Sequence, residues 1–272
     1  MRAAKPPAKF LFIINAMHIL VTNDDGVTAP GLLALAQEMR SLGQVTIVAP
    51  DHNWSASGHV KTLHRPLRVK ETLLADGSKA LASDGAPSDC VALAVLGLLP
   101  TSIYLVVSGI NPNANLGHDV TYSGTVTAAM EAAIWGLPGI AISIDYEEYG
   151  QGSLDYGPAA RVAHQVVNRV IAQGLPKATL LNVNVPDLPS EDIKGIKVTR
   201  QGLRVYRDLL VRREDPRGRP YYWIGGEAPT GVPEEGTDFG ALAEGYVSIT
   251  PLHLDLTAHQ VMDELGGWDW KL

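Results

Sequence analysis

Cysteine is nearly absent from this chain, since a single residue, Cys90, occurs in 272. One cysteine excludes an intrachain disulfide, and this usage is typical of a reducing cytosol, so we expect a cytoplasmic protein. Cys90 lies in the apolar stretch SDCVALAVLGLL, which predicts a buried helix rather than a reactive site. Apolar surroundings raise the pKa of a thiol and so make it unreactive.

Positive charge is also scarce. The 22 lysines and arginines stand against 29 aspartates and glutamates, which gives a formal net charge of −7. A nonspecific nucleic-acid binder needs basic surface to displace counterions from phosphates. The charge balance therefore excludes that class of partner and favours small-molecule chemistry.

Long apolar runs are missing, and no segment is long enough to span a membrane. Residues 1–16 are basic and then apolar, as in a signal peptide, but no small-residue cleavage site precedes a plausible mature start. We interpret them as an N-terminal extension that is either disordered or the product of an upstream start codon, with Met17 as the real beginning.

Strand-like runs and amphipathic helical stretches alternate along most of the chain. The runs HILVTN, QVTIVAP, IYLVVSGI, GIAISI and TLLNVNVP have the β-branched, apolar composition of buried strands. GLLALAQEMRSL and GPAARVAHQVVNRVIAQG have helical periodicity. The alternation predicts an α/β core with a mostly parallel sheet over residues 17–201. Ligands of such sheets bind in loops that follow strands.

The composition changes in residues 202–272. The stretch LRVYRDLLVRREDPRGRPYYWIGG predicts a β-hairpin arm around a turn at residues 215–218, and a terminal helix follows. A lone two-stranded arm is marginally stable in water, so it should pack either on its own domain or on a partner subunit. We therefore expect an arm and a C-terminal oligomerisation segment here.

Two adjacent carboxylates, Asp24 and Asp25, follow the first predicted strand in HILVTNDDG. Neighbouring strand residues point to opposite faces, so both can serve one site only if the backbone turns, which Gly26 makes easy. Paired carboxylates raise each other's pKa unless a cation neutralises them. The tetrapeptide NDDG therefore fits either a solvated turn or a divalent-metal site.

Two later loops supply further oxygen ligands after predicted strands. APDHNWSASGH contains Ser55, and NPNANLGHD contains Asn111 and Asn115. Carboxylate, hydroxyl and amide oxygens form a hard ligand set, suited to Mg²⁺, Mn²⁺ or Ca²⁺ rather than to zinc.

The stretch YSGTVTAAMEAAIWG places Ser123, Gly124 and Thr125 before an alanine-rich helix. Ser123 can serve as the helix N-cap. The same turn can hold a phosphate, because a helix N-terminus attracts anions. The two roles are compatible.

In PLHLDLTAH, a metal cluster of His253, Asp255 and His259 is disfavoured. An ion pair between Asp255 and His259, which are four residues apart, is favoured instead.

Several strings occur here in the order found in the survival protein E (SurE) family of metal-dependent nucleotide phosphatases. They include NDDG, APDHNWS, VVSGINPNANLG, YSGTVTAAMEA, NVNVPD, GTDF and GYVSITPLHLDLTAH, and the resemblance runs from about Met17 to His259. It implies a Rossmann-like, three-layer α/β core and a phosphomonoesterase, a 5′-nucleotidase, that uses one Mn²⁺ or Mg²⁺ per subunit. It also implies a homodimer or homotetramer joined through the C-terminal arm.

The resemblance assigns roles residue by residue. The four metal ligands of the family match Asp24, Asp25, Ser55 and Asn111, its phosphate loop matches Ser123, Gly124 and Thr125, and its second loop asparagine matches Asn115. The family usually has Arg-Ser-Gly where this chain has Trp54-Ser55-Ala56, and glycine where Asn113 stands. These departures concern the rim of the site, and so nucleotide preference, more than catalysis.

The first hypothesis is a phosphatase that acts on nucleoside 5′-monophosphates, and also on 3′-monophosphates or short polyphosphate. Two other classes of function are alternatives to it. One is a metal-dependent nucleotide sensor that binds without turnover. An NAD-linked oxidoreductase is disfavoured, because TNDDGVTAPG lacks the G-x-G-x-x-G that lets a backbone approach a pyrophosphate closely.

Overall fold

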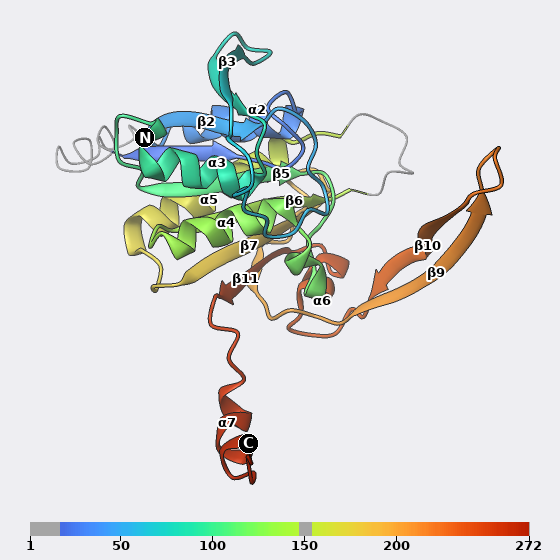
Figure 1. Cartoon of the computed structure of the whole chain (residues 1–272). Helices are drawn as coiled ribbons and strands as arrows, with labels where there is room; N and C mark the ends of the chain where they lie inside the picture. Colours follow the sequence, from blue (N-terminus) through green and yellow to red (C-terminus); the bar gives the residue numbers. More distant parts are fainter. Residues whose placement is uncertain (1–16, 147–153, 272) are drawn as a thin grey trace.

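A computed structural model describes residues 17–146 and 154–271, so the expected extension at residues 1–16 lies outside the described residues. The centre is a nine-stranded sheet with the order β3-β4-β2-β1-β5-β6-β7-β11-β8 (Figure 1). Its strands are β1 (His18–Thr22), β2 (Gln44–Pro50), β3 (Val69–Leu73), β4 (Lys79–Ser83), β5 (Leu105–Asn111), β6 (Gly139–Asp145), β7 (Thr179–Pro186), β8 (Ile196–Val198) and β11 (Val247–His253).

The five runs expected to be strands form the middle of this sheet. Strands β2, β1, β5, β6 and β7 are parallel neighbours. Their side chains are almost all buried, which explains why they read as continuous apolar runs rather than alternating ones. The α/β fold with a mostly parallel sheet is confirmed, while β3 and β11 are antiparallel to their neighbours β4 and β7.

Helices cover both faces of the sheet and complete the three layers. On one face, α2 (Pro30–Met39) and α5 (Gly157–Gln173) pack together. On the other, α3 (Pro87–Leu93), its continuation η1 (Ala94–Leu98) and α4 (Gly124–Ile134) enclose a second apolar cluster. Cys90 is fully buried in α3, and burial raises the pKa of its thiol strongly, so the predicted inert cysteine is confirmed. None of the described helices is long and apolar enough to cross a membrane.

The predicted hairpin is formed by β9 (Arg204–Glu214) and β10 (Pro220–Gly231), which extend away from the core (Figure 1). The Asp215 side chain closes its turn by accepting hydrogen bonds from the backbone N–H groups of Arg217 and Arg219, at 2.8 and 2.9 Å. Large apolar side chains on the arm remain exposed, among them Leu210 and Ile224. The arm therefore buries little of itself within its own subunit.

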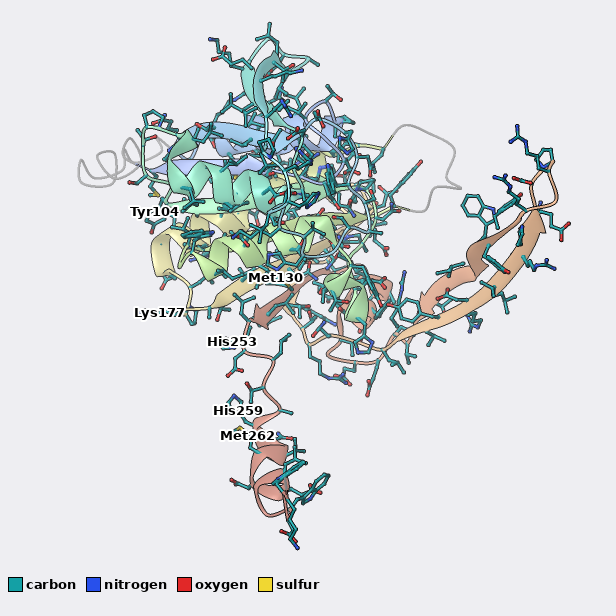
Figure 2. All side chains as sticks on the ribbon, viewed as in Figure 1. Tyr104, Met130, Lys177, His253, His259 and Met262 are labelled. Atoms are coloured by element: carbon teal, nitrogen blue, oxygen red, sulfur yellow. The ribbon has the colours of Figure 1, made fainter. Side chains whose placement is uncertain are left out.

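Beyond the arm, the chain returns to the core before it leaves again. Helix α6 (Asp238–Ala243) packs on the sheet, and β11 pairs with β7 inside it. The first strand of the arm thus begins at Arg204, whereas β11, which was expected within the arm and C-terminal segment of residues 202–272, belongs to the core sheet. The terminal helix α7 (His259–Gly266) buries none of its residues, and Figure 2 shows His259 and Met262 on this tail. The predicted pair of Asp255 and His259 is confirmed at 2.7 Å.

Candidate active site

The candidate site lies where the sheet reverses its strand order. The chain passes from β1 to β2 on one side, and β5 then pairs with β1 on the other side. In open α/β sheets, ligands bind beyond the carboxyl ends of the strands at such a switch point. Asp24 and Asp25 follow β1, and Asn111 is the last residue of β5. The topology therefore places two of the predicted ligand loops at the carboxyl ends of paired parallel strands.

The backbone turns immediately after β1, as the paired carboxylates require. The Asn23 side chain donates a hydrogen bond to the carbonyl oxygen of Gly26 at 2.9 Å. Gly26 has a φ of 104°, a value that side-chain-bearing residues rarely adopt. The carbonyl of Pro50 at the end of β2 then accepts from the N–H of Val27 at 2.7 Å. This turn buries Asp24 and leaves Asp25 half-buried.

Asp24 contacts the N-terminus of α4, on which the predicted phosphate loop lies. The hydroxyl of Thr125 donates a hydrogen bond to Oδ1 of Asp24. A Cβ added to Gly124 would lie 2.6 Å from Cβ of Asp24, so only glycine fits at this position. Burial raises the pKa of Asp24, while hydrogen bonds from the Thr125 hydroxyl and from nearby backbone N–H groups, including that of Gly124, lower it. The strand-end carboxylate and the helix turn thus form one polar unit.

The position of Asp25 raises the pKa of its carboxyl group. Burial, followed by the charge of Asp24, raises its pKa to about 6. No salt bridge joins either carboxylate to a lysine, arginine or histidine among the described residues. Two close carboxylates without a basic partner have the charge and the hard oxygens that a divalent cation needs. The donor set at the end of β1 therefore fits such a cation.

The loop after β2 reaches Asp24 through its backbone. The N–H of Trp54 donates to the carbonyl oxygen of Asp24 at 2.7 Å. Ser55 is exposed, and its N–H is held by the side chain of Asn53 at 2.7 Å. Ala56 has a φ of 57°, in the left-handed region that favours glycine. The structure therefore brings the Ser55 loop beside the carboxylate pair at some cost in backbone strain.

The loop after β5 holds the two predicted asparagines in different ways. The amide of Asn111 donates to the carbonyl oxygen of Asn113. Asn115 is buried, and its side-chain amide donates to Oγ of Ser143 at 2.7 Å. Its backbone carbonyl accepts from the amides of Asn182 and Asn184 on β7, at 2.8 and 3.1 Å. This network fixes the position of Asn115 in the loop.

Ser123 is the N-cap of α4, as one interpretation of the sequence predicts. Its Oγ accepts from the N–H of Val126 at 3.1 Å. His253, Asp255 and His259, for which the sequence disfavours a metal cluster, lie near the end of the chain. The backbone N–H of Asp255 donates to Nδ1 of His253 at 3.1 Å. Yet no group of three or more His, Cys, Asp or Glu side chains is placed to hold a metal ion in the described ranges.

Sequence reasoning missed two groups near the site. Tyr156, the residue before α5, packs against Gly31, and burial together with the nearby charge of Asp25 raises the pKa of its phenol. Glu131 on α4 is buried and binds His59 and Lys61 from the loop after β2. A glutamate inside the apolar run TAAMEAAIW was the available signal, because charged side chains are rarely buried unless paired.

Fold and site together define a doubly wound α/β protein with a carboxylate pair at the switch point, packed against a helix N-terminus. The family model described as "Survival protein SurE" matches residues 19–208. The chain therefore belongs to the SurE family.

Relatives cover almost the whole chain. A protein from Chloroflexus aggregans named 5′-nucleotidase SurE is 53% identical over 94% of this chain and 100% of its own. Another of that name from Herpetosiphon aurantiacus is 57% identical over 94% and 99%. The crystal structure of the SurE protein from Aquifex aeolicus superimposes with a TM-score of 0.75, at 44% identity over 91% of this chain and 98% of that one.

Proposed function

We propose that this protein is a divalent-metal-dependent phosphomonoesterase that hydrolyses nucleoside 5′-monophosphates to nucleoside and phosphate. Relatives at 53% and 57% identity carry the name 5′-nucleotidase over nearly the full chain. The structural observation that carries the proposal is the contact of Asp24 with Gly124 and Thr125. It sets a carboxylate pair, which attracts a cation, beside a helix N-terminus, which attracts an anion.

The cation would be held by the hard oxygens of Asp24, Asp25, Ser55 and Asn111, with Mn²⁺ or Mg²⁺ as the ion. When bound, it supplies positive charge that polarises a phosphoryl oxygen and lowers the pKa of a water molecule. The raised pKa of Asp25 supports this assignment, because a bound cation would favour the charged carboxylate and so offset the burial and the charge of Asp24 that together raise its pKa to about 6.

The phosphate group would lie against Asn115 and the turn formed by Ser123, Gly124 and Thr125. Hydrogen-bond donors fixed in advance stabilise the charge that moves onto the equatorial and leaving oxygens during transfer. Within this turn, the Thr125 hydroxyl is already engaged with Asp24. We therefore assign to the Thr125 hydroxyl the orientation of Asp24, and to Asn115, Ser123, Gly124 and the backbone of Thr125 the contact with phosphate.

Phosphate release from AMP tests the proposal. An enzyme of this kind should release phosphate with Mn²⁺ and lose the activity in EDTA, and the activity should return when Mn²⁺ is restored. AMP binding with no phosphate release would instead identify a metal-dependent nucleotide sensor. Parallel assays with 3′-AMP and short polyphosphate measure how far the substrate range extends.

We propose further that the protein forms a homo-oligomer, a dimer or a tetramer, through the arm β9–β10 and the C-terminal segment. Leu210 and Ile224, which are paired across the arm, are 71% and 82% exposed. Helix α7 exposes Val261, Met262 and Leu265 along one side. Large exposed apolar side chains gathered on one element are typical of subunit interfaces. The single buried cysteine is consistent with a cytoplasmic location.

A further inference from the structure

The loop that carries Ser55 has little structure of its own to hold it. Residues 51–68, between β2 and β3, form neither helix nor strand. The position of Ser55 relative to Asp24 therefore depends on individual contacts of this segment with its surroundings. The Trp54–Asp24 bond is one such contact on the N-terminal side of Ser55. The contacts on its C-terminal side are more numerous, and they converge on two helices.

We call residues 58–62 the strap, because they lie along α3 and α4 and bind both. The N–H of Gly58 donates to the carbonyl oxygen of Tyr122 at 2.9 Å, and its carbonyl accepts from the Thr127 hydroxyl at 3.1 Å. At the other end, the N–H and hydroxyl of Thr62 donate to the carboxylate of Asp89 at 2.9 and 2.7 Å. Asp89 is itself buried on α3.

Glu131 is the central anchor of the strap. Its side chain is 3% exposed, and its carboxylate accepts from Nε2 of His59 at 3.0 Å and from Nζ of Lys61 at 3.2 Å. The indole N–H of Trp135, on the same helix, donates to it at 2.8 Å. Burial alone would raise the pKa of Glu131, but the hydrogen bonds from His59, Trp135 and Lys61 outweigh burial and lower it to about 2. The strap thus supplies the partners that keep this buried charge ionised.

The contacts of the strap lie next to two loops of the candidate site. Tyr122, which accepts from the start of the strap, immediately precedes Ser123, the N-cap of α4. Ala56, next to Ser55, and Gly58, the first residue of the strap, have φ values of 57° and 64°, so the loop turns tightly from Ser55 into the strap. A shift of the strap therefore reaches both the Ser55 loop and the residue before the phosphate turn.

We propose that Glu131 is a positioning residue. Through His59 and Lys61 it fixes the strap, and the strap fixes Ser55 beside Asp24 and Asp25, so that loss of these two contacts weakens binding of the divalent cation. This inference rests on the proposed function, because it takes Ser55 as a ligand of that cation. Groups that orient a metal ligand from outside the ligand set commonly change metal affinity by about 10–100-fold when removed.

Direct titration of the metal-free protein with Mn²⁺, followed by electron paramagnetic resonance of the free ion, tests the proposal without any measurement of turnover. We expect Lys61→Met and His59→Gln each to raise the dissociation constant for Mn²⁺ several-fold, and the double variant to raise it about tenfold. Both side chains are partly exposed, at 48% and 31%, so these variants should fold even if Glu131→Gln does not. Lys61→Arg, which keeps the charge, should restore most of the affinity.

A matched control comes from a lysine–glutamate pair away from the strap. Lys79 lies 3.5 Å from Glu71 on the β3–β4 hairpin, and both are largely exposed. Lys79→Met should leave the Mn²⁺ dissociation constant unchanged. Glu131→Gln, where it folds, should not add to the double variant of His59 and Lys61, because the three residues act through one contact.

Two further variants separate failure of this inference from failure of the proposed function. Asp24→Asn should abolish Mn²⁺ binding, and Ser55→Ala should weaken it. If both do so while the variants of His59 and Lys61 bind Mn²⁺ like the wild type, the role of Glu131 is refuted and the metal site stands. If Ser55→Ala also binds normally, the strap has no ligand to act through, and the inference fails with the Ser55 assignment. Normal binding by Asp24→Asn would overturn the metal site itself.

Discussion

The hydroxyl of Thr125 donates a hydrogen bond to Oδ1 of Asp24, a residue 101 positions earlier in the chain. This contact joins the end of β1 to the first turn of α4. It also gives the buried carboxylate a donor that helps it to stay charged in spite of its burial. The charge state of Asp24 therefore depends on Thr125, which belongs to the predicted phosphate loop.

Replacement of Thr125 by Val tests that dependence, since it removes the hydroxyl and keeps the shape. We expect the variant to bind Mn²⁺ about tenfold more weakly and to unfold with a free energy about 1–3 kcal/mol lower, because a buried acceptor loses its donor. The Mn²⁺ titration and urea unfolding measure the two effects.

Thr22 provides the matched control for Thr125. It is fully buried at the end of β1, and its hydroxyl has no hydrogen-bond partner among the described residues. Thr22→Val should therefore be neutral or stabilising. A loss of Mn²⁺ affinity in Thr22→Val equal to that of Thr125→Val would show that the effect comes from packing and not from the bond to Asp24.

The carboxylate pair itself gives a second prediction. Asp24→Asn and Asp25→Asn should each reduce turnover by at least about 100-fold, since removal of a ligand should cost no less than removal of its support. In EDTA, Asp25→Asn should melt at a higher temperature than the wild type, because the variant no longer places a second, partly buried negative charge beside Asp24. Near wild-type rates for both variants at saturating Mn²⁺ would remove this metal site from consideration.

Glu131 predicts a pH dependence of stability. Its pKa in the folded protein is about 2, against a usual value of 4.5, so the unfolded chain binds more protons at a pH between these values. The contribution of Glu131 to stability is therefore complete above about pH 4.5 and is lost as the pH falls toward 2. The difference in unfolding free energy between wild type and Glu131→Gln should shrink over this range, as measured by urea unfolding at each pH.

A variant of Glu71, which is exposed on β3, controls for the general effect of acid. The difference between wild type and Glu71→Gln should change far less over the same pH range. A constant difference for Glu131→Gln would mean that the folded protein does not hold Glu131 ionised through His59 and Lys61.

The arm gives a prediction about assembly. Its two ends are joined by a hydrogen bond from the N–H of Val232 to the carbonyl oxygen of Leu203 at 3.1 Å. Residues 204–231 can therefore be replaced by a short Asn-Gly turn. We expect the shortened protein to have a smaller native mass by light scattering, since the exposed apolar face of the arm is removed.

Arg204 and Tyr206 at the base of the arm bind Asp119 near the phosphate turn, so the deletion also removes contacts of the core. Leu210→Ser combined with Ile224→Ser keeps that base and changes only the outer face of the arm. It should lower the native mass in the same way. An unchanged mass in both variants would place the subunit contacts elsewhere.

The sequence could predict the strands of the sheet centre and the residues at their ends. Buried parallel strands are apolar throughout, and the carboxyl ends of neighbours meet at one edge, which located Asp24 and Asn111. β11 was not foreseen as part of the core, because it contains Pro251, which cannot donate to a strand ladder. The anchoring role of Glu131 was also missed, since its partners lie some 70 positions away in an irregular loop.

The geometry of the site also bears on the route of phosphoryl transfer. A covalent route needs a nucleophile that is free to attack phosphorus. Asp24 is buried and engaged by Thr125, and both aspartates are assigned to the cation. Oγ of Ser123 caps α4, and no hydrogen bond joins it to a histidine in the part of the chain that the structure describes. A serine without a base beside it is a weak nucleophile.

We therefore expect direct attack by water on phosphorus, in line with the leaving nucleoside, without a phosphorylated enzyme. One displacement inverts the configuration at phosphorus, whereas two restore it. A nucleoside phosphorothioate made chiral at phosphorus with two oxygen isotopes and hydrolysed in water that carries the third should give inverted thiophosphate. Ser123→Ala should then keep the inversion, although its rate falls with the loss of the helix cap and of the proposed phosphate contact. Retention in the wild type would require a covalent intermediate, and Asp25 or Ser123 would have to be its nucleophile.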